Sequence, residues 1–99
     1  MIEQKIKHMT FTMVANQLQT NPRTLERESI RTYLQQKLLS INGEILRLAM
    51  RYGVGSVREF EKAARKGTIR EDERTLEDFF SFDHLEAQRK KLKQLLVGL

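Results

Sequence analysis

Apolar residues recur along the middle of the chain at alternating intervals of four and three residues. The positions that share this spacing are Leu34, Leu38, Ile41, Ile45, Leu48 and Tyr52. Because the spacing keeps side chains on one face of an α-helix, it predicts a heptad seam. Asn21 is suited to cap this helix, Pro22 to begin it and Gly53 to end it. We therefore expect one helix over about Pro22–Tyr52, roughly 45 Å long.

This helix carries more apolar surface than a short chain can cover. Leu39, Leu46 and Ala49 widen the seam into a stripe that can meet two neighbours. The 99 residues suit a single domain over 1–99, and a chain of this length buries only about 60–70% of its unfolded surface. We therefore expect two chains to pair as a helical dimer, with the six seam residues given above at the interface.

Two more helices are predicted after Gly53. Ser56 followed by Glu59 forms a capping box, and the helix that it opens ends at Gly67. The stretch "KGTIREDERT" indicates an exposed charged loop, and Thr75 with Asp78 offers a further cap.

The spacing of three and four residues returns near the end of the chain. It runs through Leu85, Gln88, Leu92, Leu95 and Leu99. This pattern predicts a last helix from about Asp83 to Val97, packed antiparallel along the long helix. The expected fold is all-α: a short N-terminal segment, one long helix, a short helix and the returning C-terminal helix.

The first twenty residues fit two structures. Ile2, Ile6, Met9 and Met13 fit a helix, whereas Met9, Phe11 and Met13 alternate with threonines as in a short strand over 9–14. A strand followed by helices is the ribbon-helix-helix pattern, which also binds DNA as a dimer, but the helix that follows here is longer than that fold uses. The helix is our prediction and the strand is the alternative.

The stretch "VANQLQTNPRTLERESI" fits a helix-turn-helix in part. Ala15 would let the second helix cross closely, with Val14 and Leu18 facing inward against Leu25. The residue after Leu18 is usually glycine, because the backbone there is left-handed, and here it is Gln19. The residues that would begin the recognition helix and contact DNA are Asn21, Arg23, Thr24, Arg27 and Arg31. A basic, solvated helix face explains the same residues equally well.

The charge distribution permits contacts with phosphate. The net charge is +5, from 18 basic and 13 acidic residues. Residues 1–52 hold 8 basic and 4 acidic residues. Residues 53–82 hold 6 basic and 7 acidic residues, and residues 83–99 hold 4 basic and 2 acidic residues. The basic excess therefore lies in the N-terminal half and the last helix, which suits nucleic-acid binding without requiring it.

Composition excludes several kinds of chemistry. There is no cysteine, so disulfides and thiolate catalysis are excluded. His8 and His84 lie far apart, and "YGVGS" lacks the lysine of a phosphate-binding loop, so we expect no enzyme, metal or cofactor. No apolar run is long enough to span a membrane, and "MIEQKIKHM" has no signal-peptide core, so we expect a cytoplasmic protein.

Two stretches resemble known families. "NQLQTNPRTLERES" resembles the helix-turn-helix of arabinose-regulator-type activators over this short segment. "RESIRTYLQQKLLSINGEILRLAMRYGVGSVREFEKAARKGTI", followed by "LEDFFSFDHLEAQRKKLKQLL", is similar to a group of small, mostly uncharacterised prokaryotic proteins frequent in archaea and thermophiles. The matching residues are Tyr52-Gly53-Val54, Ser56, Gly67, Asp78-Phe79-Phe80, Asp83-His84-Leu85 and Leu92.

The second resemblance implies an antitoxin-like regulator that is not an enzyme and pairs with a small toxin. Such a protein binds operator DNA as a dimer and covers its toxin with amphipathic helices. Here 1–31 would be the DNA-binding segment, and 32–99 the region for dimerisation and partner binding. The residues expected against the protein partner are Phe79, Phe80, Phe82, Leu85, Leu92 and Leu95.

Three alternatives remain open from the sequence. Instead of meeting a partner, Phe79, Phe80, Phe82 and Leu85 could close the hydrophobic core, since aromatic residues at helical spacing usually pack inward. The chain could be a helical protein-interaction module without nucleic-acid binding, in which Arg23, Arg27 and Arg31 pair with nearby glutamates. It could also be a structural subunit of a larger complex, which predicts large exposed apolar patches.

Overall fold

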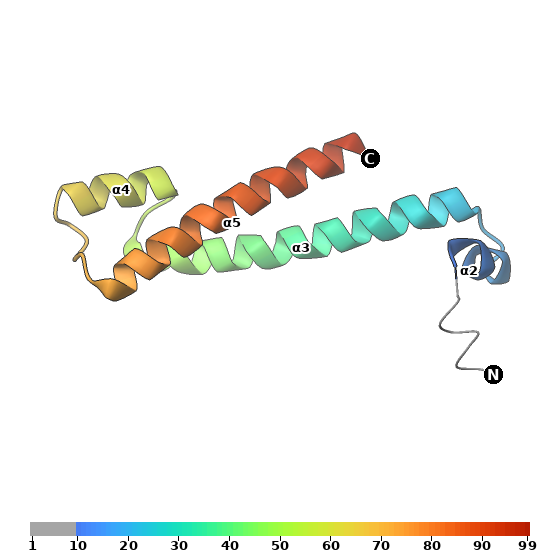
Figure 1. Ribbon diagram of the computed structural model, residues 1–99, viewed down its shortest axis with the longest axis horizontal. Coiled ribbons are helices and arrows are strands. Elements are labelled where there is room, and N and C mark those ends of the chain that lie inside the picture. Colours follow the sequence, from blue (N-terminus) through green and yellow to red (C-terminus); the bar gives the residue numbers. More distant parts are fainter. Residues whose placement is uncertain (1–9) are drawn as a thin grey trace.

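The computed structural model describes residues 10–99, and every regular element in that range is a helix (Figure 1). The helices are α2 (Phe11–Gln17), α3 (Pro22–Tyr52), α4 (Val57–Arg65) and α5 (Glu73–Gly98). The predicted all-α fold is therefore confirmed for this part of the chain. The expectations placed on Ile2, Ile6, His8 and Met9 lie outside the described residues.

The alternative of a strand over 9–14 is wrong for the positions that the structure describes. Phe11–Gln17 form α2, and Thr10 caps this helix by accepting a hydrogen bond from the N–H of Met13 at 3.3 Å. The alternation of apolar residues with threonines is therefore not the signature of a strand here. A threonine at the cap position stabilises the first turn of a helix instead.

The boundaries of α3 agree with those predicted. The Asn21 side chain accepts hydrogen bonds from the N–H groups of Arg23 and Thr24, at 2.8 and 3.4 Å, and Pro22 fills the first turn. Gly53 ends the helix in the left-handed conformation, with φ of 66°. Local signals at both ends thus set a helix of 31 residues.

The start of α5 differs from the prediction. The helix begins at Glu73 instead of near Asp83, so the aromatic segment "LEDFFSF" lies within its first turns. The cap is Asp72, whose side chain accepts the N–H of Thr75, while the Thr75 hydroxyl accepts the N–H of Asp72. This reciprocal pair satisfies two backbone donors at once, and it replaces the predicted cap by Thr75 with Asp78.

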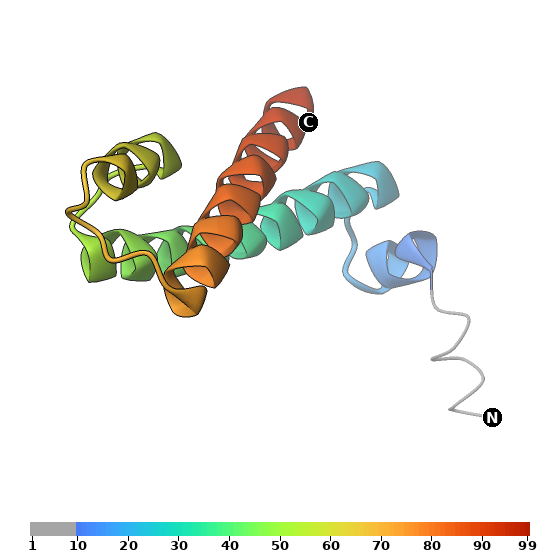
Figure 2. The same cartoon turned by 60° about the vertical axis from the view of Figure 1, so that its left-hand side comes forward.

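The helices form an elongated molecule. α5 returns antiparallel to α3, crosses the C-terminal half of α3 and diverges from it toward its own end (Figures 1 and 2). The N-terminal third of α3 extends beyond this crossing and carries α2 at its far end (Figure 1). The principal extents are 61 × 30 × 16 Å. None of the helices described for residues 10–99 is long and apolar enough to cross a membrane.

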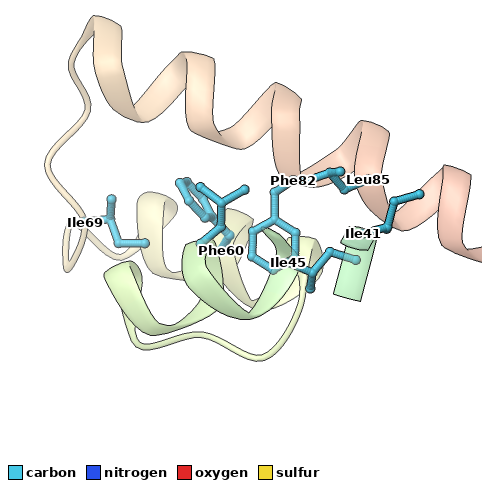
Figure 3. Close-up of a cluster of buried hydrophobic side chains, with 7 residues drawn as sticks. Ile41, Ile45, Phe60, Ile69, Phe82 and Leu85 are labelled. Atoms are coloured by element: carbon cyan, nitrogen blue, oxygen red, sulfur yellow. The ribbon is translucent and has the colours of Figure 1, made fainter. Parts of the chain in front are cut away.

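The hydrophobic core lies where α3, α4 and α5 meet. Its buried members are Ile41, Ile45, Leu48, Phe60, Ile69, Phe82 and Leu85 (Figure 3). Phe60 is the central aromatic residue, with ring-centroid distances of 4.5 Å to Tyr52, 5.6 Å to Phe79 and 6.3 Å to Phe82. These tilted and edge-to-face contacts join α4 to both long helices.

α4 is capped by its own loop and by α5. Ser56 accepts the N–H of Glu59 at 3.1 Å, as the predicted capping box requires. The Glu59 carboxylate returns to the N–H of Gly55 instead of Ser56. Glu86 of α5 accepts the N–H of Val57 at 3.0 Å. A carboxylate at a helix N-terminus also interacts favourably with the helix dipole, so Glu86 helps to hold α4 in place.

Candidate partner-binding surfaces

The residues predicted to contact DNA lie on the projecting end of α3. Arg23, Thr24, Arg27 and Arg31 are exposed, whereas the Asn21 side chain is already engaged in capping. The ion pairs found among residues 10–99 are Arg51–Asp78 and Arg65–Glu61, so the structure shows no ion pair for these three arginines. Their guanidinium groups therefore face solvent on an arm that α4 and α5 do not cover (Figure 1).

The contact between α2 and α3 matches the predicted helix-turn-helix only partly. Ala15 is fully buried, as a close crossing requires, and Val14 and Leu25 are half-buried. Leu18, predicted to face inward, is 65% exposed. Gln19 has a φ of 56°, so the turn is left-handed although the residue is not glycine. The left-handed turn is therefore present although Gln19 departs from the usual glycine, and the inward position predicted for Leu18 is wrong.

The six seam residues of α3 face the interior of their own chain. Leu34, Ile41, Ile45 and Leu48 are buried, and Leu38 and Tyr52 are half-buried. Ile41, Ile45 and Leu48 pack in the core with residues of α4 and α5. Four of the six side chains are thus buried within a single chain, and dimerisation through the seam stays a prediction. A contact of α3 that leaves this core unchanged would use a different face.

The opposite side of α3 carries such a face, which we call the outer face of α3. It comprises Thr32, Gln36, Leu39, Gly43, Leu46 and Met50. Its apolar members are strongly exposed, at 74% for Leu39, 59% for Leu46 and 74% for Met50. At 100° per residue these six positions cluster on the side of the helix opposite the core seam. α3 is therefore apolar on two opposite sides, and the described residues cover one of them.

The residues expected against a protein partner divide between core and surface. Phe82 and Leu85 are buried in the core, and Phe79 and Leu92 are half-buried against it. The alternative that the aromatic segment closes the core therefore describes Phe82 and Leu85. Phe80 and Leu95 remain exposed, at 60% and 49%. A partner that meets α5 would thus contact Phe80 and Leu95 and would not reach Phe82 or Leu85.

A pocket of about 600 Å³ opens between α4, the loop after it and the start of α5. Apolar side chains on its lining are Phe60, Ala64, Ile69, Leu76 and Phe79. Charged side chains on its lining are Glu61, Arg65, Glu71, Asp72 and Glu73. Glu61 and Arg65 pair with each other one helical turn apart, so the remaining carboxylates leave the rim acidic. We call this feature the α4–α5 pocket.

A polar cluster joins the end of α3 to α5. Arg51 and the Tyr52 hydroxyl both donate to Oδ2 of Asp78, with an Arg51 Nη1 to Oδ2 distance of 2.8 Å. Burial alone would raise the pKa of Asp78, but the hydrogen bonds from Tyr52 and Arg51 lower it below its ordinary value. Burial first, and then the bond to Asp78, raises the pKa of Tyr52. The residue spacing gave no signal for this contact, which joins positions far apart in the sequence.

The described residues hold no group of three histidine, aspartate, glutamate or cysteine side chains placed to bind a metal ion. His84 is exposed on α5. We therefore assign no metal site within residues 10–99.

Comparison with known proteins gives a family. Residues 9–99 match the family described as "Uncharacterized protein MJ0235 family". The chain belongs to this family. No curated protein and no solved structure gives a significant match.

Membership of the MJ0235 family agrees with the resemblance at the coarse level. The match includes all four described helices, so the arm of α3 and the crossing of α3 with α5 belong to one family unit. The family description names no activity, and the antitoxin part of the resemblance remains a prediction.

Proposed function

We propose that this member of the MJ0235 family is a helical interaction module that binds another protein through the outer face of α3. The observation that supports the proposal is the exposure of Leu39, Leu46 and Met50 on one side of a single helix. Large apolar side chains that lie exposed on one face of a helix are typical of interaction surfaces in soluble proteins. The proposal assigns no catalytic step to the chain.

The chemistry of the outer face suits a helical partner. Its members carry no formal charge, and charged residues are depleted at the centres of protein interfaces. Gly43 has no side chain, and a Cβ added there would meet no atom within 4 Å. A partner helix could therefore approach α3 closely at Gly43, with Leu39 and Leu46 on either side. An amphipathic helix laid along α3 would bury these side chains at helical spacing.

Photo-crosslinking from the full chain tests this proposal. A photoreactive amino acid is placed at Leu46 and, as the matched control, at Glu44, which is about 160° away around the helix. In the organism that makes the protein, we expect an adduct with one discrete second protein from position 46 and none from position 44. The purified partner should then bind the Leu46→Asp variant at least tenfold more weakly and the Glu44→Ala variant with unchanged affinity.

Two results would overturn the proposal. One is equal labelling from positions 46 and 44, which would mean that the outer face has no preferred partner. The other is an adduct from position 46 that contains only a second copy of this chain. In that case the outer face serves self-association instead of binding a different protein.

A second candidate function is binding of duplex DNA by the arm. It is favoured by the exposure of Arg23, Arg27 and Arg31 without an ion pair in the described structure. Guanidinium groups on a projecting helix can reach phosphates or base edges. A DNA-binding arm together with a protein-binding face is the combination expected of an antitoxin-like regulator.

A gel shift with the protein's own promoter, run across a salt series, tests this candidate. A triple variant with Arg23→Gln, Arg27→Gln and Arg31→Gln should bind DNA more weakly. The slope of log affinity against log salt concentration should fall by about one for each phosphate that the variant no longer neutralises. The matched control replaces Arg58, Lys62 and Arg70, which are also exposed, with glutamine. Equal weakening in both variants, or no preference for the promoter over random duplex, would exclude specific DNA binding by the arm.

A further inference from the structure

The two halves of α5 carry opposite charge. Residues 73–86 contain five acidic residues and one basic residue, whereas residues 87–98 contain four basic residues and none that is acidic. Asp78 and Glu86 are engaged within the chain, so the exposed carboxylates of the first half are Glu73, Glu77 and Asp83. The helix thus presents an acidic end and a basic end to solvent.

An exposed apolar row links these two ends. Leu76, Phe80 and Leu95 are 56%, 60% and 49% exposed, and Ala87 lies between them on the surface. At 100° per residue, these four positions fall within about 100° of one another around the helix. They lie on the side of α5 away from the buried Phe82 and Leu85. We call this row the outer face of α5.

We infer that two copies of the chain pair antiparallel through the outer face of α5. The antiparallel arrangement places the acidic half of each helix against the basic half of the other, and a two-fold axis repeats the contact. When the two helices are aligned about their midpoint, Leu76 of one copy lies at the same level along the helix axis as the partner's Leu95. In the same alignment Phe80 lies opposite the partner's Lys91, an arrangement that allows a cation–π contact.

The charge gradient also has an explanation within one chain. Acidic residues near the N-terminus of a helix and basic residues near its C-terminus favour the helix macrodipole. That effect stabilises a single helix and does not depend on a second copy. The exposed apolar row is not explained by the dipole, and self-association of the full chain separates the two explanations.

Sedimentation equilibrium of charge-reversed full chains is the test. One variant carries Glu73→Lys and Glu77→Lys, and the other carries Lys90→Glu and Lys91→Glu; all four positions are exposed. We expect the natural chain to dimerise and each variant alone to do so at least tenfold more weakly. An equimolar mixture of the two variants should recover most of the association, because each supplies the end that the other lacks. Helix content by circular dichroism shows that both variants remain folded.

Replacing single apolar residues with serine shows which helix forms the contact between the two copies. Leu76→Ser should weaken self-association, whereas Leu39→Ser, on the outer face of α3, should leave it unchanged. The inference is wrong if the natural chain is monomeric at millimolar concentration, or if the mixture of charge variants associates no better than each alone. It is also wrong if Leu39→Ser abolishes the dimer while Leu76→Ser does not. These results do not bear on binding of a different protein to α3, which is tested separately by crosslinking.

Discussion

At the scale of single residues, the Asp78 carboxylate accepts hydrogen bonds from two side chains of another helix. It accepts from Arg51 and Tyr52 and so ties the end of α3 to α5. We expect Asp78→Asn to lower the free energy of unfolding by about 1 kcal/mol at pH 7, since charged hydrogen bonds at a partly exposed site contribute on that order. Urea denaturation of the variant and the natural chain measures the difference.

The effect of Asp78 should depend on pH. The folded state lowers the pKa of Asp78, so its stabilising contribution is complete above the unfolded pKa of about 4. The contribution disappears as the pH falls through the folded pKa. The difference in free energy of unfolding between the Asp78→Asn variant and the natural chain should therefore disappear at low pH. Asp83→Asn, at an exposed site on the same helix, is the control and should show no such difference.

Two glycines of α3 should respond in opposite ways to alanine. Gly53 has a φ of 66°, so Gly53→Ala is expected to lower the free energy of unfolding by about 1 kcal/mol. Gly43 lies within the helix, and Gly43→Ala is expected to raise it by about the same amount. A Cβ meets no atom within 4 Å at either site, so backbone conformation alone sets the sign. Thermal unfolding of the two variants, at low protein concentration, checks the prediction. A stabilised Gly53→Ala variant would contradict the left-handed end of α3.

Residues that act locally were the ones that the sequence could predict. Asn21, Pro22, Gly53 and Ser56 perform the roles assigned to them, because capping depends on neighbours within a few positions. The Tyr52–Asp78 contact joins residues 26 positions apart. Such a contact requires the fold to bring them together, and residue spacing carries no signal for it.

At the scale of helices, α4 depends on one aromatic side chain. Phe60 is the buried residue of α4, and it contacts aromatic rings from both α3 and α5. Phe60→Ala should cost about 3–5 kcal/mol, as expected for removal of a buried aromatic ring. Hydrogen exchange should show the largest decrease of protection in α4. Phe80→Ala, at an exposed ring, should cost less than about 1 kcal/mol when measured on dilute protein. Comparable destabilisation in the two variants would contradict the placement of Phe60 at the centre of the core.

The helices themselves were predictable, but not the partner that covers each face. The heptad spacing of α3 correctly identified one apolar side, while the chain's own α4 and α5 cover that side. The antiparallel packing of the last helix along α3 was predicted, but the extent to which the chain covers the seam was not, because α5 begins ten residues earlier than its leucine pattern suggests. Its first turns are held by the Asp72–Thr75 pair and by aromatic side chains instead of leucines.

At the scale of the whole molecule, the chain is far from compact. Its radius of gyration is 20.2 Å, whereas a compact chain of this length has about 13 Å. The difference arises because the N-terminal third of α3 projects beyond the crossing with α5 and has only α2 packed on it (Figure 1). The arm leaves Arg23, Arg27 and Arg31 accessible to partners.

Small-angle X-ray scattering tests this shape. The Leu76→Ser variant at low concentration is the suitable sample, because weaker pairing through α5 leaves single chains in solution. We expect a radius of gyration of about 20 Å and a maximum dimension of at least the longest extent of 61 Å. A chain that ends at residue 99 but begins at Tyr33 would lack the arm and keep the core residues of α3, and it serves as the comparison, with a smaller radius. A value near 13 Å for the full chain would mean that the arm folds back onto α5, and the accessible surfaces on it would then be covered.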